Sequence, residues 1–230
     1  MWRVKIFGKP KPPINFTLSL NTESTLPSVF IIDLDQPINI SLPNSTTADI
    51  ASSQTVPNPE YFLIQRQIAR ALIARYAHLD ASFIKIQKTK TGALEIYPQT
   101  GLYISLSHRG GITAFALSTH PIGIDLEIHD TKIDIPWNVL HTFERTRIER
   151  ADTSKRMNIF YQIWTSKEAC VKALGLGFAI APDSFCILPE HTFLTLNKKN
   201  IDIEYKMLEI LTDKTIHVSV AQDIPFLRLI

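Results

Sequence analysis

The segment from residue 103 to residue 128 constrains the fold most, because it predicts three β-strands in direct succession. The first two strands, 103–109 and 112–118, are separated by a Gly-Gly turn. A Thr-His-Pro sequence then interrupts the pattern before the third strand, Ile122–Ile128. We therefore expect a β-sheet in the core of the chain, built from neighbouring segments.

The third of these strands carries two carboxylates on one face. Because side chains alternate along a strand, Ile124, Leu126 and Ile128 face one side. Asp125 and Glu127 therefore project together from the other side. An Asp-x-Glu pair is by itself most often the solvated outer face of a half-exposed sheet, so it needs further support as a functional site.

A long helix is predicted before these strands. Asn58-Pro59-Glu60 supplies a capping side chain, a proline at the first helical position and an acid in the first turn. The helix is expected to continue to about His78. Its apolar face consists of Ile64, Ile68, Ala71 and Leu72, with Arg66 and Arg70 elsewhere on the cylinder.

A second long helix is predicted from about residue 154 to residue 174, followed by a glycine that ends it. Trp164, Glu168 and Lys172 are spaced four apart and share one stripe, and Lys167 lies beside it. We expect Trp164 to anchor the helix by packing. The ordinary interpretation of Glu168 and Lys172 is a surface ion pair that contributes about 0.2–0.5 kcal/mol.

The remaining segments are assigned as strands where apolar residues run together and as loops where turn residues cluster. Strands are expected at 28–35, 82–87, 93–97, 215–221 and 226–230, loops at 36–58 and 134–141, and a charged segment at 144–150.

Composition and charge exclude several classes of protein. The 230 residues carry a formal net charge of +2, which is too mild to indicate a nucleic-acid surface. No stretch reaches the roughly 18 consecutive apolar residues that span a membrane, and Met1–Pro13 lacks the apolar core of a secretory signal. The two cysteines are far apart without CxxC spacing, which favours a reducing compartment. We expect a cytoplasmic protein that binds neither nucleic acid nor membrane.

Asp125 and Glu127 become candidates for a functional site when they are considered together with the second long helix. If Glu168 approached Asp125 and Glu127, the three carboxylates would repel one another unless a cation neutralised them. Mg²⁺ takes oxygen ligands and is commonly shared with substrate phosphates. With Lys167, Lys172 and His108 nearby, the acids predict a site for a metal-bound pyrophosphate, although His108 taken alone is more often a turn residue.

The same residues resemble a known family. The run 160–185, with its W-T-x-K-E-A-x-x-K core, resembles the second signature of 4′-phosphopantetheinyl transferases of the surfactin-synthetase-activating type. Residues 123–127 (GIDLE) are similar to the first signature, and residues 105–108 (SLSH) to the segment before it. The resemblance covers roughly residues 60–190 and has the three motifs in the same order.

The resemblance implies transfer of the phosphopantetheine arm of coenzyme A to a serine of an apo-acyl, polyketide or peptidyl carrier protein. The residues that it implies have three roles. Asp125, Glu127 and Glu168 would hold Mg²⁺, and Glu168 would also be the base for the carrier serine. Lys167 and Lys172 would pair with the pyrophosphate, and Lys172 would also donate a proton to the leaving phosphate. Ser107 and His108 would contact the nucleotide phosphates.

The resemblance also implies an α+β fold of two similar α/β lobes related by pseudo-twofold symmetry, with the cofactor cleft between them. The lobes would be residues 1–119 and 120–230, and a monomer would suffice.

Two departures from the family pattern leave alternatives open. The Gly-Lys-Pro that often precedes the Ser-Leu-Ser-His segment is replaced by residues 92–94 (GAL), with Lys88 or Lys90 as substitutes. The basic stretch that reaches the 3′-phosphate is also missing, so that role falls to Arg66, Arg70 or Arg75. The alternatives are a catalytically lapsed relative that binds coenzyme A or a carrier, a Mg²⁺-dependent phosphohydrolase, and an interaction module with coincidental acids.

Overall fold

The computed structural model describes residues 3–7, 26–36, 41–130, 132–177, 180–188, 193–196, 199–211 and 215–223. The strands of its two larger sheets are β1 (Arg3–Phe7), β2 (Ser28–Asp33), β5 (Tyr103–Arg109), β6 (Ile112–Ser118), β7 (Ile122–Ile128), β8 (Phe193–Leu196), β9 (Lys199–Leu211) and β10 (Thr215–Asp223). A separate hairpin consists of β3 (Lys85–Lys88) and β4 (Leu94–Tyr97). The α-helices are α1 (Thr47–Ser53), α2 (Pro59–Ala77), α3 (Thr142–Arg150) and α4 (Thr153–Ala173).

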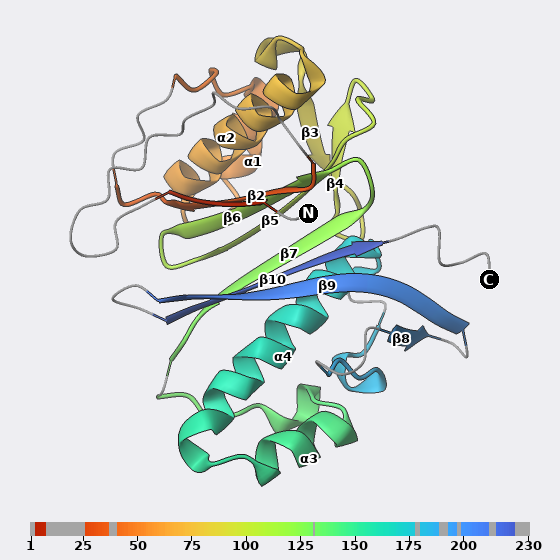
Figure 1. The fold of residues 1–230 in the computed structure, drawn as a ribbon. Coiled ribbons are helices and arrows are strands. Elements are labelled where there is room, and N and C mark those ends of the chain that lie inside the picture. The colour runs from red at the N-terminus through yellow and green to blue at the C-terminus, as the bar shows by residue number, and fades with distance from the viewer. Residues whose placement is uncertain are drawn as a thin grey trace.

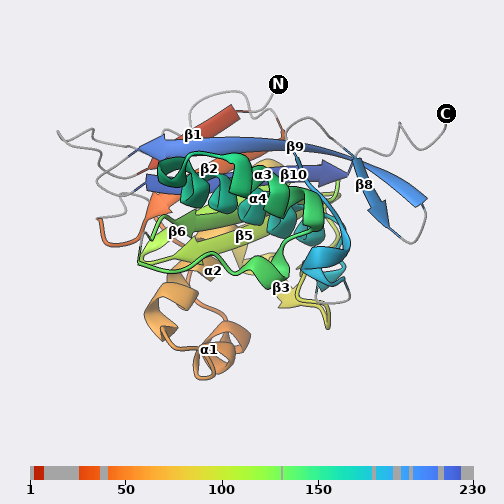
Figure 2. The same ribbon diagram turned by 90° about the horizontal axis from the view of Figure 1, so that it is seen from below.

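Two four-stranded sheets lie face to face between two long helices (Figure 1). The first sheet has the order β1-β2-β6-β5, and α2 covers its outer face. The second has the order β7-β10-β9-β8, and α4 lies across its outer face (Figure 2). The α+β class is therefore confirmed, whereas the pseudo-twofold relation between the halves stays a prediction.

The strands β2 and β6 of the first sheet are buried on both faces, which explains why they are so apolar. On β2, Phe30 and Ile32 pack under α2, whereas Val29 and Ile31 face the second sheet. The strand β6 alternates in the same way, with phenylalanine and leucine toward α2 and two alanines toward the second sheet. The apolar face of β7 completes this middle layer, as its alternation predicts.

The two sheets share no strand, and they meet where β5 lies beside β7. The Oγ of Ser105 on β5 accepts a hydrogen bond of 3.1 Å from the backbone N–H of Ile124 on β7. The connection from β6 to β7 contains residues 119 and 120, where the predicted lobe boundary falls. The side chains of the Ser-Leu-Ser-His segment thus link the halves of the molecule.

Most predicted elements are found within a few residues of their expected bounds, but the loop predicted at 36–58 is partly wrong. It contains α1, whose first turn is fixed by a capping box between Thr46 and Asp49. The charged segment 144–150 belongs to α3. The strand predicted at 226–230 lies outside the described residues. None of the described helices has the length and apolar composition needed to cross a membrane.

The second sheet and α4 approach most closely at Gly123 on β7. A Cβ atom at this position would lie 1.9 Å from the carbonyl oxygen of Ala169 and 2.4 Å from the backbone nitrogen of Ala173. Both atoms belong to the helix backbone, so neither can turn away. The glycine is therefore required for space, and it sets how closely the acid-bearing strand and α4 can pack.

We predict that Gly123→Ala lowers the free energy of unfolding by about 1–3 kcal/mol, the usual cost of overpacking a core. Gly101→Asn is the matched control, because nothing lies within 4 Å of a Cβ at that position and asparagine tolerates its φ of +71°. Urea unfolding of both variants measures the effect. Equal stability of the two variants would show that the contact between β7 and α4 adapts freely.

Candidate functional site

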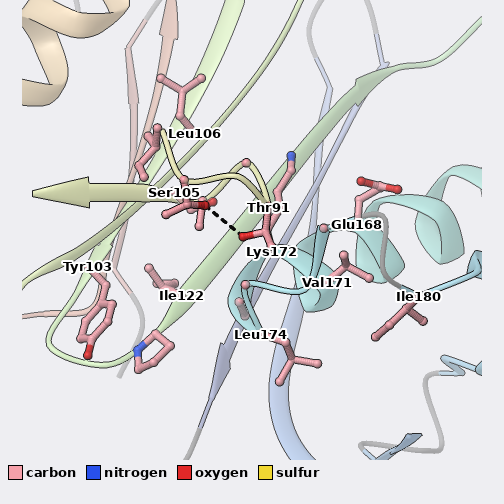
Figure 3. Close-up of a pocket in the computed structure, with 18 of the residues that line it drawn as sticks. Thr91, Tyr103, Ser105, Leu106, Ile122, Glu168, Val171, Lys172, Leu174 and Ile180 are labelled. Atoms are coloured by element: carbon pink, nitrogen blue, oxygen red, sulfur yellow. Dashed lines mark hydrogen bonds between the residues drawn. The ribbon is translucent and has the colours of Figure 1, made fainter. Parts of the chain in front are cut away.

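A cavity of about 590 Å³ opens where the two halves of the molecule meet. Its lining comes from the β3–β4 hairpin, β5, the start of β7, α4 and the segment that follows α4. Figure 3 shows Tyr103, Ser105 and Leu106 on one side of this space, with Glu168 and Ile180 on the other. A space of this size and position suits a small-molecule ligand.

Asp125 is the centre of a hydrogen-bond network beside the cavity. The Nζ of Lys172 donates to its Oδ1 at 2.7 Å and to the carbonyl oxygen of Ile124 at 3.0 Å. The Oγ of Ser107 donates to the same Oδ1 at 2.9 Å. The other carboxylate oxygen, Oδ2, is buried and has no partner among the described residues. The carboxylate of Asp125 is therefore held in one orientation, and its Oδ2 makes no hydrogen bond within the described part of the chain.

Glu127 and Glu168 are half-buried and interact electrostatically with Asp125. Burial raises the pKa of Glu127, and the charges of Asp125 and Glu168 raise it further, whereas Arg109 and Lys172 oppose the shift. Burial and then Asp125 also raise the pKa of Glu168. The charge of Asp125 thus opposes the ionisation of both glutamates.

These acids fit a hard divalent cation in donor type and in charge. Carboxylate oxygens are preferred by Mg²⁺, and Asp125 has one buried oxygen without a partner in the described part of the chain. In this conformation the ammonium group of Lys172 supplies positive charge beside Asp125. No group of three or more His, Cys, Asp or Glu residues within the described ranges is already arranged around a metal position. The magnesium site therefore stays a prediction.

His108 lies at the exposed end of the same segment of β5. Partial desolvation lowers the pKa of its imidazole, and the positive charge of Lys172 lowers it further. Both effects favour the neutral form of the ring. Lys88 and the Gly-Ala-Leu stretch 92–94 line the cavity from the β3–β4 hairpin, near the position where the sequence predicts nucleotide contacts.

Lys167 makes different contacts from those expected. It was predicted to pair with a pyrophosphate, but its side chain is 1% exposed and its ammonium group already has a partner. Its Nζ lies 2.7 and 2.8 Å from the two carboxylate oxygens of Glu144, and it also donates to the carbonyl oxygen of Phe185. Because the charge is neutralised inside the protein, the lysine anchors α4 from within.

Glu144 was not singled out from the sequence, although it organises this region. It is fully buried and accepts hydrogen bonds of 2.8 Å from the backbone N–H groups of Ile187 and His141, in addition to the ion pair with Lys167. The carboxylate therefore joins α3, α4 and the segment after α4 that lines the cavity. The spacing from His141 to Glu144 is that of a capping box, and this was the signal available.

Arg70 is also placed differently from the expectation. It was predicted to bind the cofactor, yet its side chain is 1% exposed. Its guanidinium group pairs with Asp49 of α1 and donates to the carbonyl oxygen of Asn44 at 2.9 Å. The guanidinium group that was expected to reach a 3′-phosphate is therefore already paired with a carboxylate. Arg66 is half-buried and lies over the ring of Phe62, with its pKa lowered by burial.

Trp164 packs as expected. Its ring stacks on Phe160, with centroids 6.4 Å apart, and it also borders the cavity.

Comparison with known proteins finds similarity to one family in the same segments. Residues 121–221 match the family model described as "4'-phosphopantetheinyl transferase superfamily". This range contains the strand acids, α4 and β10. The resemblance of the sequence motifs is therefore confirmed.

Several curated relatives carry the same description. "4'-phosphopantetheinyl transferase gsp" of Aneurinibacillus migulanus is 31% identical over 43% of this chain and 42% of its own length. "4'-phosphopantetheinyl transferase Sfp" of Bacillus subtilis (strain 168) is 26% identical over 61% of this chain and 68% of its own length. "4'-phosphopantetheinyl transferase HetI" of Nostoc sp. is 29% identical over 74% of this chain and 75% of its own length. The chain thus spans less than half of the gsp protein.

We predict that Lys167→Met lowers the free energy of unfolding by about 3–5 kcal/mol, because it leaves Glu144 as an uncompensated buried charge. Adding Glu144→Gln removes that charge and is expected to restore part of the loss. Urea unfolding of the wild type, the single variant and the double variant measures both steps.

The control for this prediction is Lys155→Met. Lys155 pairs with Asp152 at 3.5 Å, and both side chains are more than two-thirds exposed. This variant is expected to change stability by less than about 1 kcal/mol. If Lys167→Met were no more damaging than Lys155→Met, the buried pair would not anchor α4.

Proposed function

We propose that this chain transfers the 4′-phosphopantetheine arm of coenzyme A to a serine of an apo-carrier protein, because residues 121–221 match the family model described as "4'-phosphopantetheinyl transferase superfamily". The carrier is an acyl, polyketide or peptidyl carrier, and adenosine 3′,5′-bisphosphate is released. The observation that carries the proposal is the cavity that Glu168 and Lys172 line, beside which the Nζ of Lys172 lies 2.7 Å from Oδ1 of Asp125.

In the proposed complex, coenzyme A occupies the cavity between the halves, and Asp125, Glu127 and Glu168 would hold Mg²⁺. When bound, the Mg²⁺ would supply positive charge that neutralises the diphosphate. Ser107 keeps Asp125 in place through its 2.9 Å hydrogen bond. The neutral ring of His108 donates a hydrogen bond to a nucleotide phosphate.

The transfer is a phosphoryl transfer, which depends mostly on positioning and on charge neutralisation. The serine oxygen forms a bond to the β-phosphorus as the bond from that phosphorus to the bridging oxygen breaks. Glu168 accepts the proton of the serine hydroxyl. Lys172 provides charge, and a proton, to the leaving phosphate.

The proposal gives Lys167 and Arg70 supporting roles instead of contacts with the cofactor, since both are paired with buried carboxylates. Lys167 fixes the turn of α4 that presents Glu168, its neighbour in the sequence. Arg70 ties α1 to α2. Lys88, which lines the cavity, is then the candidate for a nucleotide contact that the missing Gly-Lys-Pro would otherwise provide.

The proposal includes the finer organisation that the family resemblance implies. The lobes are residues 1–119 and 120–230, related by pseudo-twofold symmetry, with the cofactor cleft between them. The separation of the two sheets at the connection from β6 to β7 supports this division. We include a monomeric state because one chain supplies both walls of the cavity, and a cytoplasmic location because the cysteines have no CxxC spacing.

The two alternative functions, a lapsed relative and a phosphohydrolase, would give different results from a transferase in the same assay. A lapsed relative would bind coenzyme A without changing the mass of a carrier, and a phosphohydrolase would release product in the absence of a carrier. Incubation with coenzyme A and Mg²⁺, with and without apo-carriers, therefore separates them from a transferase.

We predict that Glu168→Gln folds normally and lowers the transfer rate by about 10²–10⁴-fold, because the amide cannot accept the serine proton. The rate is followed by intact mass spectrometry of an apo-carrier. Glu149→Gln is the matched control, since Glu149 is an exposed glutamate of α3 and is expected to leave the rate unchanged. Full activity of Glu168→Gln would remove this residue from the mechanism.

We predict that Asp125→Ala weakens the dependence of transfer on Mg²⁺, so that half-maximal rate requires at least about tenfold more metal. The reason is the loss of the best-oriented acid of the site. A Mg²⁺ titration of the transfer rate measures the shift, and an unchanged titration curve would place the metal elsewhere.

A further inference from the structure

A second group of metal-binding side chains lies at the end of β7, beyond the proposed coenzyme A site. His129 follows the last residue of β7, and His217 is on the neighbouring strand β10. Their ring centroids are 5.6 Å apart, and the Nε2 of His217 lies 3.4 Å from the Nδ1 of His129. Two imidazole nitrogens from different strands therefore face each other.

The strand register explains why the two rings meet. Glu127 is the cross-strand partner of His217, so their side chains share the face of the sheet that α4 covers. His129 is two residues beyond Glu127 and belongs to the same face by alternation. The two histidines are thus diagonal neighbours on a paired ladder, which is a rigid support for a ligand.

Tyr161 of α4 holds the rings in place. Its ring stacks on His217 with an interplanar angle of 11° and a centroid distance of 5.3 Å, and it lies 5.2 Å from the ring of His129. The hydroxyl of Tyr161 accepts a hydrogen bond from the backbone N–H of Asp130. His217 is only 2% exposed, so its ring has little freedom to turn away.

The separation of the two nitrogens is compatible with a shared metal ion. Two nitrogens that each lie about 2.0–2.1 Å from a tetrahedral zinc ion are about 3.3–3.4 Å apart. The Nε2 of His217 and the Nδ1 of His129 are 3.4 Å apart, a distance that also allows a weak hydrogen bond between the rings.

The chemistry around the pair also suits a cation. Glu127 and Asp130 bring negative charge to this end of the strand, and Arg109 offsets part of it through its pairing with Glu127 at 3.4 Å. Imidazole nitrogen selects zinc and similar transition metals over magnesium or calcium.

We propose that His129 and His217 form a binding site for a divalent transition-metal ion of the zinc type, separate in donor chemistry from the acids at the cavity. In the proposed site the two imidazoles bind the ion and water completes its coordination. The site does not depend on the proposed transferase activity.

The test is calorimetric titration of Zn²⁺ into the metal-free full chain, in a buffer that contains excess Mg²⁺ to occupy the acids. The wild type is expected to bind one equivalent of zinc that Mg²⁺ does not displace. His129→Gln and His217→Asn are each expected to weaken this binding by at least about tenfold.

His78→Asn is the control variant. His78 is exposed at the end of α2 with a φ of 54°, which asparagine tolerates, so this variant is expected to bind zinc like the wild type. Circular dichroism checks the fold of each variant. If the more buried His217→Asn fails to fold, His129→Gln, at the strand end, decides the question.

Two results would overturn the proposal. The first is a wild type that binds no zinc in the presence of Mg²⁺. The second is unchanged zinc affinity in a folded His129→Gln variant, which would mean that other side chains take up the metal.

Discussion

The contact between β7 and α4 at Gly123 determines where the functional groups of this protein can lie. The strand and the helix backbones touch there, with no room for a Cβ atom between Gly123 and the carbonyl of Ala169. Asp125 lies two residues along the strand from this contact, and Glu168 is the helix residue before Ala169. The close packing of two backbones therefore fixes the relation between the strand acids and the helix acid more firmly than long side chains could.

Gathering carboxylates at this contact is electrostatically unfavourable, and the surrounding residues limit the cost. Burial and mutual repulsion raise the pKa values of Glu127 and Glu168. Lys172 places an ammonium group against Asp125, and Ser107 donates to the same oxygen. An arrangement that opposes its own ionisation, beside a cavity and with one buried carboxylate oxygen unpartnered in the described structure, is typical of a site that binds a cation or a charged ligand.

Local pattern was sufficient to predict the three strands from 103 to 128 and both long helices, because alternation, a Gly-Gly turn and capping residues act over a few positions. It failed where stability comes from contacts distant in the sequence. The helix α1 was missed because the buried pair between Asp49 and Arg70 supports it, and these residues are 21 positions apart. Lys167 was assigned to the cofactor because its buried partner belongs to a different helix. In both cases a basic residue that the sequence suggested as a phosphate ligand is paired with a buried carboxylate from a distant segment.

The central claim is that acids from β7 and α4 bind one divalent cation together with the diphosphate of coenzyme A. Electron–nuclear double resonance with Mn²⁺ in place of Mg²⁺ tests it directly, because coupling to ³¹P reports a phosphorus atom next to the metal. The account predicts strong ³¹P coupling when coenzyme A is added to the Mn²⁺-loaded protein. A Mn²⁺ spectrum that coenzyme A leaves unchanged would contradict it.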